Sequence, residues 1–182
     1  MITRERVRLR APGRDDLPRF VAWLNDPDVR QGLSLYLPLS LDQEQEWYEN
    51  MLKTPADEHP LVIEIRSGDA WIPVGNCGFH QLDWRNRSAE LGIFIGEKSY
   101  WSQGYGSEVM SMLLEHGFAT LNLNRIYLRV FADNLRAIRS YEKSGFVHEG
   151  NMRQAEYHHN QYVDLLFMSV LRSEWQDSQD AS

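Results

Sequence analysis

The residues whose types and spacing could do chemistry are concentrated between Ala89 and Glu108. An apolar, β-branched stretch is followed there by a short loop, by Gly104 and Gly106, and by the start of a long helical pattern. Glycine has no Cβ, so the backbone N–H groups of such a turn can converge on an anion, and the helix dipole adds roughly +0.5 charge. A phosphate or pyrophosphate is the ligand that suits this turn.

Three interpretations of the turn compete. A P-loop needs Gly, four residues and then Gly-Lys-Ser/Thr, and the chain lacks that pattern here. A dinucleotide fingerprint needs Gly-x-Gly-x-x-Gly, but its third glycine position holds Val109, and eight residues (96–103) separate the strand from Gly104. A glycine-rich turn without a ligand is the third interpretation, and these residues alone leave it open.

A second segment runs from Asp133 to Phe146 and directly follows an apolar strand pattern. Asn134 stands at the strand-to-helix junction, where its amide can cap the helix or hold an amide of a ligand. Tyr141 follows two helical turns later, on the same helix face. A purely structural cap and a packing tyrosine would account for the same residues, so this segment alone does not decide between the two.

Taken together, and in this order and spacing, the two segments resemble the GNAT superfamily of N-acetyltransferases. The family's phosphate loop, Gln/Arg-x-x-Gly-x-Gly/Ala, falls on residues 101–106, with Trp101 departing from it at the first position. The family's second signature is intact as Asn134, Ala137, Tyr141, Gly145 and Phe146. The resemblance covers about residues 8–171, and residues 23–29 look like the branch of ribosomal-protein N-terminal and diamine acetyltransferases.

This resemblance implies where the donor, acetyl-CoA, would bind. The donor would lie in a V between the strand that ends at Ile95 and the strand at 126–130. Its pantetheine arm would pair with backbone groups of Ile93, Phe94 and Ile95, and Asn134 would contact the same arm. Its pyrophosphate would rest on the backbone amides of Trp101, Ser102, Gln103, Gly104, Tyr105, Gly106 and Ser107.

The resemblance also implies that an amine attacks the thioester directly, which requires two proton transfers. Tyr141 is expected to be the acid that protonates the leaving thiolate, the role that a tyrosine has at this position in the family. The substrate ammonium must lose a proton first, and Glu90 is the expected base, acting through water. An ion pair with a neighbouring arginine is the alternative role for Glu90, and His80 and Glu64 are alternative bases.

The elements that must position these residues follow from hydrophobic periodicity. The pattern predicts an α+β fold: a mixed, mostly antiparallel central sheet of about seven strands with helices on both faces. The resemblance implies the acyl-CoA N-acyltransferase fold. The length predicts a single domain at 1–175, and the polar composition of 176–182 predicts a C-terminal tail. We expect strands at 6–10, 61–65, 72–82, 89–95, 126–130, 146–153 and 163–171, and helices from Asp15 or Asp16 to Asn25 and at 41–52, 104–121 and 135–144.

Composition excludes several classes of protein. The 182 residues carry a formal charge of −7, which argues against a nucleic-acid binder and is compatible with a cationic substrate. The single cysteine, Cys77, excludes an internal disulfide, and no third ligand accompanies His158-His159, so we expect no metal site. No signal peptide and no run of ~18 apolar residues is present, so we expect a cytoplasmic protein without a membrane partner.

The expected acceptor is a small-molecule or peptide primary amine. The resemblance favours a protein N-terminal or peptide amine. The acidic residues between 42 and 58 favour the alternative, spermidine or another diamine, although they would equally suit a solvated helix face. A non-catalytic acetyl-CoA-binding regulatory module is an alternative of another class. Dimers are common in this branch, which leaves a homodimer open.

Overall fold

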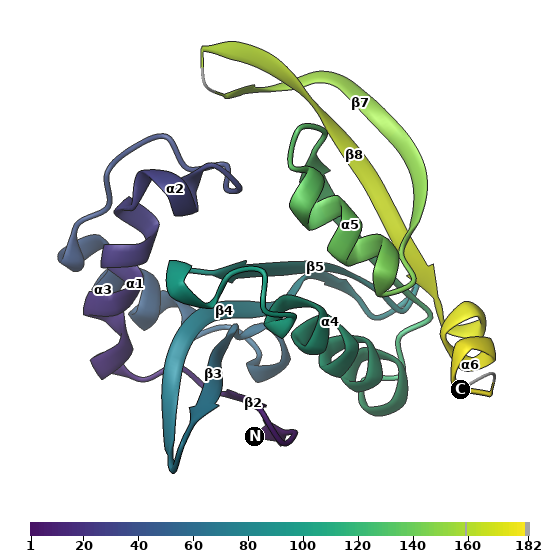
Figure 1. Cartoon of the computed structure of the whole chain (residues 1–182), viewed down its shortest axis with the longest axis horizontal. Coiled ribbons are helices and arrows are strands. Elements are labelled where there is room, and N and C mark those ends of the chain that lie inside the picture. The colour runs from purple at the N-terminus through teal and green to yellow at the C-terminus, as the bar shows by residue number, and fades with distance from the viewer. Residues whose placement is uncertain (159, 181–182) are drawn as a thin grey trace. The chain divides into compact units, whose positions relative to one another are not determined.

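The computed structural model describes residues 1–158 and 160–180, which form an α+β fold around one mixed sheet. The eight strands lie in the order β1-β2-β3-β4-β5-β6-β8-β7. The long antiparallel pair β7 and β8 is labelled in Figure 1. They are β1 (Ile2–Thr3), β2 (Val7–Arg10), β3 (Leu61–Ser67), β4 (Ala70–Asp83), β5 (Ser88–Ile95), β6 (Arg125–Phe131), β7 (Val147–His158) and β8 (Gln161–Leu171). The predicted fold class is confirmed, and the short strand β1 brings the number of strands to eight.

The α-helices of the described residues are α1 (Leu17–Asn25), α2 (Pro27–Arg30), α3 (Leu41–Met51), α4 (Tyr105–Glu115), α5 (Leu135–Lys143) and α6 (Arg172–Asp180). Helices α1, α3, α4 and α5 correspond to predicted helices, whereas the short helix α2 was not predicted. The predicted helix at 104–121 is α-helical only to Glu115 and continues as a π-helical turn at His116–Thr120. Helix α6 has no counterpart in the sequence pattern, and it contains residues 176–180 of the segment that was expected to be a polar tail.

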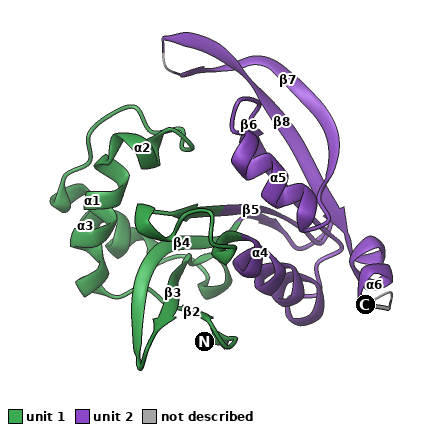
Figure 2. Cartoon of the chain, viewed as in Figure 1, with its two compact units in different colours: residues 1–79, 93–106 green, residues 80–92, 107–182 purple. Residues whose placement is uncertain are grey.

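The chain divides into two compact units, coloured separately in Figure 2. The first unit comprises residues 1–79 and 93–106, and the second comprises residues 80–92 and 107–182. The boundary therefore falls within β4, β5 and α4.

In the first unit, helices α1 and α3 pack on apolar side chains of the sheet. Their shared core contains Leu17, Phe20, Trp23, Tyr48, Met51 and Val62, with Phe94 of β5 packed against it. Pro27 cannot continue α1, and the Asp26 side chain accepts a hydrogen bond from the backbone N–H of Asp28, which starts α2. Helix α3 begins at a reciprocal cap between Ser40 and Gln43.

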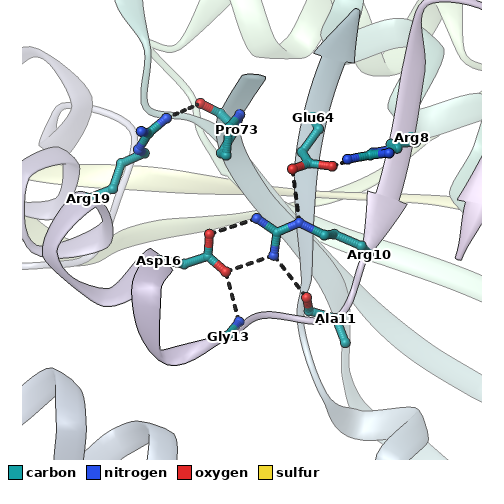
Figure 3. Close-up of polar contacts among 8 residues, drawn as sticks. All are labelled: Arg8, Arg10, Ala11, Gly13, Asp16, Arg19, Glu64 and Pro73. Atoms are coloured by element: carbon teal, nitrogen blue, oxygen red, sulfur yellow. Dashed lines mark hydrogen bonds and ion pairs between the residues drawn. The ribbon is translucent and has the colours of Figure 1, made fainter. Parts of the chain in front are cut away.

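A buried ion-pair network joins β2 and β3 to the start of α1 (Figure 3). Arg10 donates from Nη1 and Nη2 to Asp16 at 2.7 Å each and from Nε to Glu64 at 2.9 Å, while Arg8 also pairs with Glu64. Burial pushes the pKa of Asp16 upward, but hydrogen bonds from Arg10 and from the backbone N–H of Gly13 outweigh burial and hold that pKa below its usual value. Glu64 is 4% exposed, and its two carboxylate oxygens accept from Arg8 and Arg10, so the carboxylate belongs to this network.

In the second unit, strand β6 separates an apolar face from a polar one. Ile126, Leu128 and Val130 are buried, whereas Arg125 and Arg129 alternate with them on the other face. Strand β6 pairs antiparallel with β8 along its whole length, and β8 pairs with β7. Helix α6 packs against the π-helical turn that follows α4, where the Trp175 and Phe118 rings lie 5.5 Å apart.

Candidate active site

The glycine turn of the first unit combines left-handed backbone with open space at the start of α4. Gly104 has φ +85°, which glycine adopts without strain, and Ser102 also has a positive φ of +60°. A Cβ on Gly106 would meet nothing within 4 Å, so the protein leaves open space above the start of α4. These features fit the pyrophosphate expected at this turn, because the first N–H groups of a helix have no partner inside the helix.

Trp101, the departure from the family pattern, ties this turn to the end of β5. Its indole Nε1–H donates to the carbonyl oxygen of Ile95 at 2.7 Å. Gln103 donates from Nε2 to the carbonyl oxygen of Ser99 at 2.6 Å, which closes the loop further. The aromatic residue therefore fixes the loop on the strand that precedes it.

Arg6 is a cation beside the turn that sequence reasoning did not single out. Its guanidinium lies 5.0 Å from the centroid of the Tyr105 ring, and one of its nitrogens lies 4.0 Å from the Cβ that Gly104 lacks. The strand pattern at 6–10 gave no signal for this role, since Arg6 and Gly104 are brought together only by the fold.

The end of β5 is held by close packing in the first unit. Ile93, Phe94 and Ile95 are half-buried, and the Phe94 ring meets Trp23 edge-on at 6.4 Å. A Cβ on Gly75 would overlap the carbonyl oxygen of Phe94, so this glycine is what lets β4 and β5 approach each other there. The backbone of the predicted pantetheine-binding stretch is therefore rigidly backed.

Asn134 caps α5 in the second unit, as one of its two interpretations predicts. Its Oδ1 accepts from the backbone N–H of Ala137 at 3.2 Å. That bond uses only the carbonyl half of the amide, and the two N–H donors of Nδ2 are not part of the cap. The cap is therefore compatible with the predicted contact to a ligand amide.

Tyr141 lies on α5 and is half-buried beside Phe146, with ring centroids 6.0 Å apart. Burial raises the pKa of Tyr141 to about 12, and Arg136 lowers it only partly. The hydroxyl makes no hydrogen bond to any other residue that the structure describes. Tyr141 is thus a protonated phenol with a free O–H, which is what a proton donor needs.

Ser107 and Ser140 bring the two sequence motifs together within the second unit. Their hydroxyl oxygens lie 2.9 Å apart, so one donates to the other across the first turn of α4 and the middle of α5. Ser140 directly precedes Tyr141 in the chain. The helix that follows the glycine turn and the helix that carries the phenol are therefore in direct contact.

Glu90, the predicted base, is engaged in an ion pair. Both its oxygens accept from Arg129, at 2.7 Å from Nε and at 3.1 Å from Nη2. Its side chain is 12% exposed and that of Arg129 is 40% exposed. The pair lines a cavity of about 270 Å³ together with Gln81, Arg125, Tyr127, Met152 and Phe167.

His80, an alternative base, packs against β5. A Cβ on Gly92 would lie 2.8 Å from Nε2 of His80, so the glycine makes room for this ring. His80 and Glu90 thus both lie at the part of β5 that belongs to the second unit.

Cys77 and His158, the other residues with reactive side chains, are packed against the rest of the protein. Cys77 is 3% exposed, and burial raises the pKa of its thiol. His158 stacks on Phe131 with ring centroids 4.4 Å apart, and His159 lies outside the described residues. Within residues 1–158 and 160–180, no group of three or more metal-binding side chains is assembled, and no helix is both long and apolar enough to cross a membrane.

Comparison with known proteins decides the family. The sequence model of the acetyltransferase (GNAT) domain matches residues 6–147. The chain belongs to the GNAT acetyltransferases. It is an N-acetyltransferase, and the membership that its two motifs predicted is confirmed.

Relatives of this N-acetyltransferase are similar over nearly its whole length. The spermidine N(1)-acetyltransferase of Vibrio cholerae is 28% identical over 170 residues, which cover 93% of this chain and 95% of that protein. A crystal structure of spermidine N-acetyltransferase from Vibrio cholerae, in complex with CoA and spermine, has a TM-score of 0.86 at 26% identity and covers 93% of this chain and 98% of that one. A Bacillus subtilis protein, named provisionally as a ribosomal N-acetyltransferase, is 31% identical over 102 residues, 56% of this chain and 55% of its own.

Proposed function

We propose that this N-acetyltransferase transfers the acetyl group of acetyl-CoA to a primary amine of an aliphatic polyamine such as spermidine. The observation that carries the choice of acceptor is the full-length similarity to a spermidine N-acetyltransferase whose crystal structure holds CoA and spermine. The formal charge of −7 supports a polycationic acceptor as well, because an acidic protein concentrates cations near its surface.

The glycine turn is proposed to bind the pyrophosphate of the donor. Backbone N–H groups between Trp101 and Ser107 would donate to phosphate oxygens, and the guanidinium of Arg6 would add a full positive charge beside Gly104. Backbone groups of residues 93–95 and the Nδ2 of Asn134 would bind the amide-bearing arm. Acetyl-CoA supplies the activated acyl group, whose thioester carbonyl is open to attack by an amine.

Tyr141 is proposed to protonate the leaving sulfur. The amine nitrogen forms a bond to the carbonyl carbon, the carbon–sulfur bond breaks, and the thiolate takes the proton of the Tyr141 hydroxyl. Water then returns a proton to the phenolate, and the proton lost by the amine leaves through a base or solvent. A thiolate is the weaker base in water, so the donation depends on a site in which a thiolate is poorly solvated.

A peptide N-terminus is the second candidate acceptor, supported by the similarity to the Bacillus subtilis protein. A polyamine requires carboxylates spaced along the acceptor site, whereas a peptide requires backbone partners in a groove. Several acidic residues of 42–58 lie on the exposed surface of α3, which suits a polycation better than a peptide.

The test is an acceptor panel. Release of CoA thiol would be followed with acetyl-CoA and spermidine, spermine, putrescine, or a peptide that begins with Ala or Ser, and mass spectrometry would identify the acetylated product. We expect turnover with spermidine to exceed turnover with the peptides at least tenfold in kcat/KM. Preferential acetylation of the peptides would replace the polyamine assignment by the second candidate. Binding of acetyl-CoA without turnover on any amine would instead indicate a regulatory binding module.

A further inference from the structure

We propose that Arg129 is a positioning residue of the acetyl transfer, and that Glu90 acts by pairing with Arg129 rather than as the general base. The pair would fix the point at which β5 and β6 separate, and thereby the seat of the pantetheine arm. This inference rests on the proposed function in one respect, that the arm binds at this separation.

The pair lies at the end of the parallel pairing between β5 and β6. Strands β5 and β6 pair at Ser88↔Arg125, Ala89↔Ile126 and Glu90↔Tyr127, and their register goes no further in the described residues. Arg129 is two positions beyond Tyr127 and therefore projects from the same face of β6. From there its guanidinium reaches back to both oxygens of Glu90 and bridges the place where the strands part.

Beyond this point each strand is held on its far side, β5 by β4 and β6 by β8. Strand β6 continues to Phe131 and remains paired with β8, through Arg129↔Phe167 as far as Phe131↔Leu165. On its β5 side, β6 has no further pairing after Tyr127 among the described residues. An extended, amide-bearing arm could pair with this unpaired edge of β6 as an added strand would, so the point at which the strands separate decides where that arm binds.

The geometry makes Glu90 better suited to this structural role than to proton abstraction. A bidentate guanidinium–carboxylate pair fixes two groups in a plane as well as attracting them. Both carboxylate oxygens of Glu90 are directed at the Arg129 guanidinium, so the carboxylate is oriented by that pair. Loss of either partner would leave the other charge without its counter-ion and free the strand ends to shift.

A second ion pair on the same face of β6 provides a matched control. Arg125 pairs with Glu149 of β7, and Ser169 of β8 bonds to both. That pair joins β6 to β8 and β7, and Arg125 lies opposite Ser88, at the start of the β5–β6 pairing rather than at the end where the strands separate. The Glu149→Gln substitution therefore removes a comparable ion pair from the same strand without touching the separation.

The experiment is a set of binding and rate measurements on Glu90→Gln, Arg129→Gln, the double variant and Glu149→Gln. Titration calorimetry with CoA measures donor affinity independently of any acceptor. We expect each single substitution at the pair to weaken CoA binding about tenfold, and the double variant to be no weaker than either single one. Glu149→Gln should bind CoA as the wild type does. The acidic limb of the pH profile of kcat/KM should persist in Glu90→Gln.

Two results would overturn the inference. Loss of the acidic limb in Glu90→Gln, with Arg129→Gln near normal, would make Glu90 the general base and overturn the inference. Unchanged CoA affinity in both single variants would also overturn it. Arg129→Lys keeps the charge but loses the planar fork, so we expect an intermediate affinity, and thermal melting verifies that each variant is folded. If the wild type acetylates no amine, the proposed function fails, while the CoA titrations still test the positioning pair.

Discussion

At the scale of a single residue, the reaction depends on the proton of the Tyr141 hydroxyl. Burial raises the pKa of Tyr141 to about 12, so the phenol stays protonated through about pH 10, where an ordinary tyrosine is half ionised. We predict that kcat with saturating spermidine does not fall between about pH 8 and pH 10.5. Steady-state rates over that range, with circular dichroism to verify the fold, test this. A decline centred near pH 10 would show that Tyr141 ionises as an exposed tyrosine does.

Glu44 of α3 gives a prediction about stability. Its side chain is 5% exposed, it has no ionic or hydrogen-bonding partner among the described residues, and burial raises its pKa. A carboxyl whose pKa is higher in the folded state favours folding at low pH, and this benefit is lost as pH rises through the unfolded and then the folded pKa. At pH 7 the buried charge is therefore a cost, and we predict that Glu44→Gln raises the free energy of unfolding by about 1 kcal/mol.

Urea unfolding at pH 7 and near pH 4.5 would measure this effect. The gain from Glu44→Gln should shrink at the lower pH, where a larger fraction of the wild-type carboxyl is protonated. Glu46→Gln, an exposed position on the same helix, should change the free energy of unfolding by less than about 0.5 kcal/mol. A destabilised Glu44→Gln variant would contradict the prediction and mean that the carboxylate is stabilised by a favourable interaction.

Residue types predicted only part of the site. Gly104 and Asn134 were recognisable, because a positive φ and a helix cap each demand particular side chains in one short segment. Arg6 and Arg129 were not recognisable, because their neighbours Gly104 and Glu90 are distant in the sequence and meet only after folding. The alternation of a strand predicts which face an arginine lies on, but not which group it will contact.

At the scale of an element, Arg172 stabilises the irregular end of α4. The π-helical turn at His116–Thr120 leads to Asn122, whose φ is +56°. Arg172 donates from Nε to the carbonyl oxygen of Leu123 at 2.9 Å, and from Nη2 to the carbonyl oxygen of Phe118 at 2.6 Å. These bonds satisfy carbonyl groups that the end of the helix leaves open.

We predict that Arg172→Ala lowers the free energy of unfolding by about 1–3 kcal/mol, because partly buried carbonyl groups lose charge-assisted donors. Chemical denaturation of Arg172→Ala, with Arg85→Ala in the exposed β4–β5 turn as its control, measures the difference. An equal, small effect of both substitutions would show that water replaces Arg172 without loss.

The elements predicted best were those with strong local signals. Strand β6 and helices α1 and α3 were placed within a residue or two, because strand alternation, the helical spacing of apolar residues and the break at Pro27 are all local. Helix α6 was missed because its sequence is polar and its support comes from Trp175 packing on Phe118, a distant contact. The π-helical turn was missed because its apolar spacing continues that of α4.

At the scale of the whole molecule, the net charge should strengthen the binding of a cationic acceptor. A formal charge of −7 attracts a polycation over distances that salt screens, with a Debye length of about 10 Å at 0.1 M. We predict that the KM for spermidine rises several-fold between about 0.05 M and 0.5 M NaCl, with little change in kcat. The KM for a monoamine such as butylamine should rise much less. Equal salt dependence of the two amines would remove the electrostatic argument for a polyamine.

The family was predictable at this scale because two short motifs occur in the right order across the chain. The division into two units was not predictable, because its boundary falls inside β4, β5 and α4 and leaves no linker in the sequence. A boundary in the middle of regular elements has no compositional signature, unlike a Gly-, Pro- or Ser-rich connection between domains.

The central claim, that Tyr141 protonates the thiolate of CoA, is tested most directly by Tyr141→Phe. The measurement is kcat with saturating spermidine, paired with the Kd for acetyl-CoA, for the wild type, Tyr141→Phe and Tyr48→Phe, a buried tyrosine of the first unit. We predict that Tyr141→Phe lowers kcat by about 10²–10⁴-fold, changes the Kd by less than about twofold, and that Tyr48→Phe changes neither appreciably. A Tyr141→Phe enzyme whose kcat stays within a few-fold of the wild type would contradict the claim.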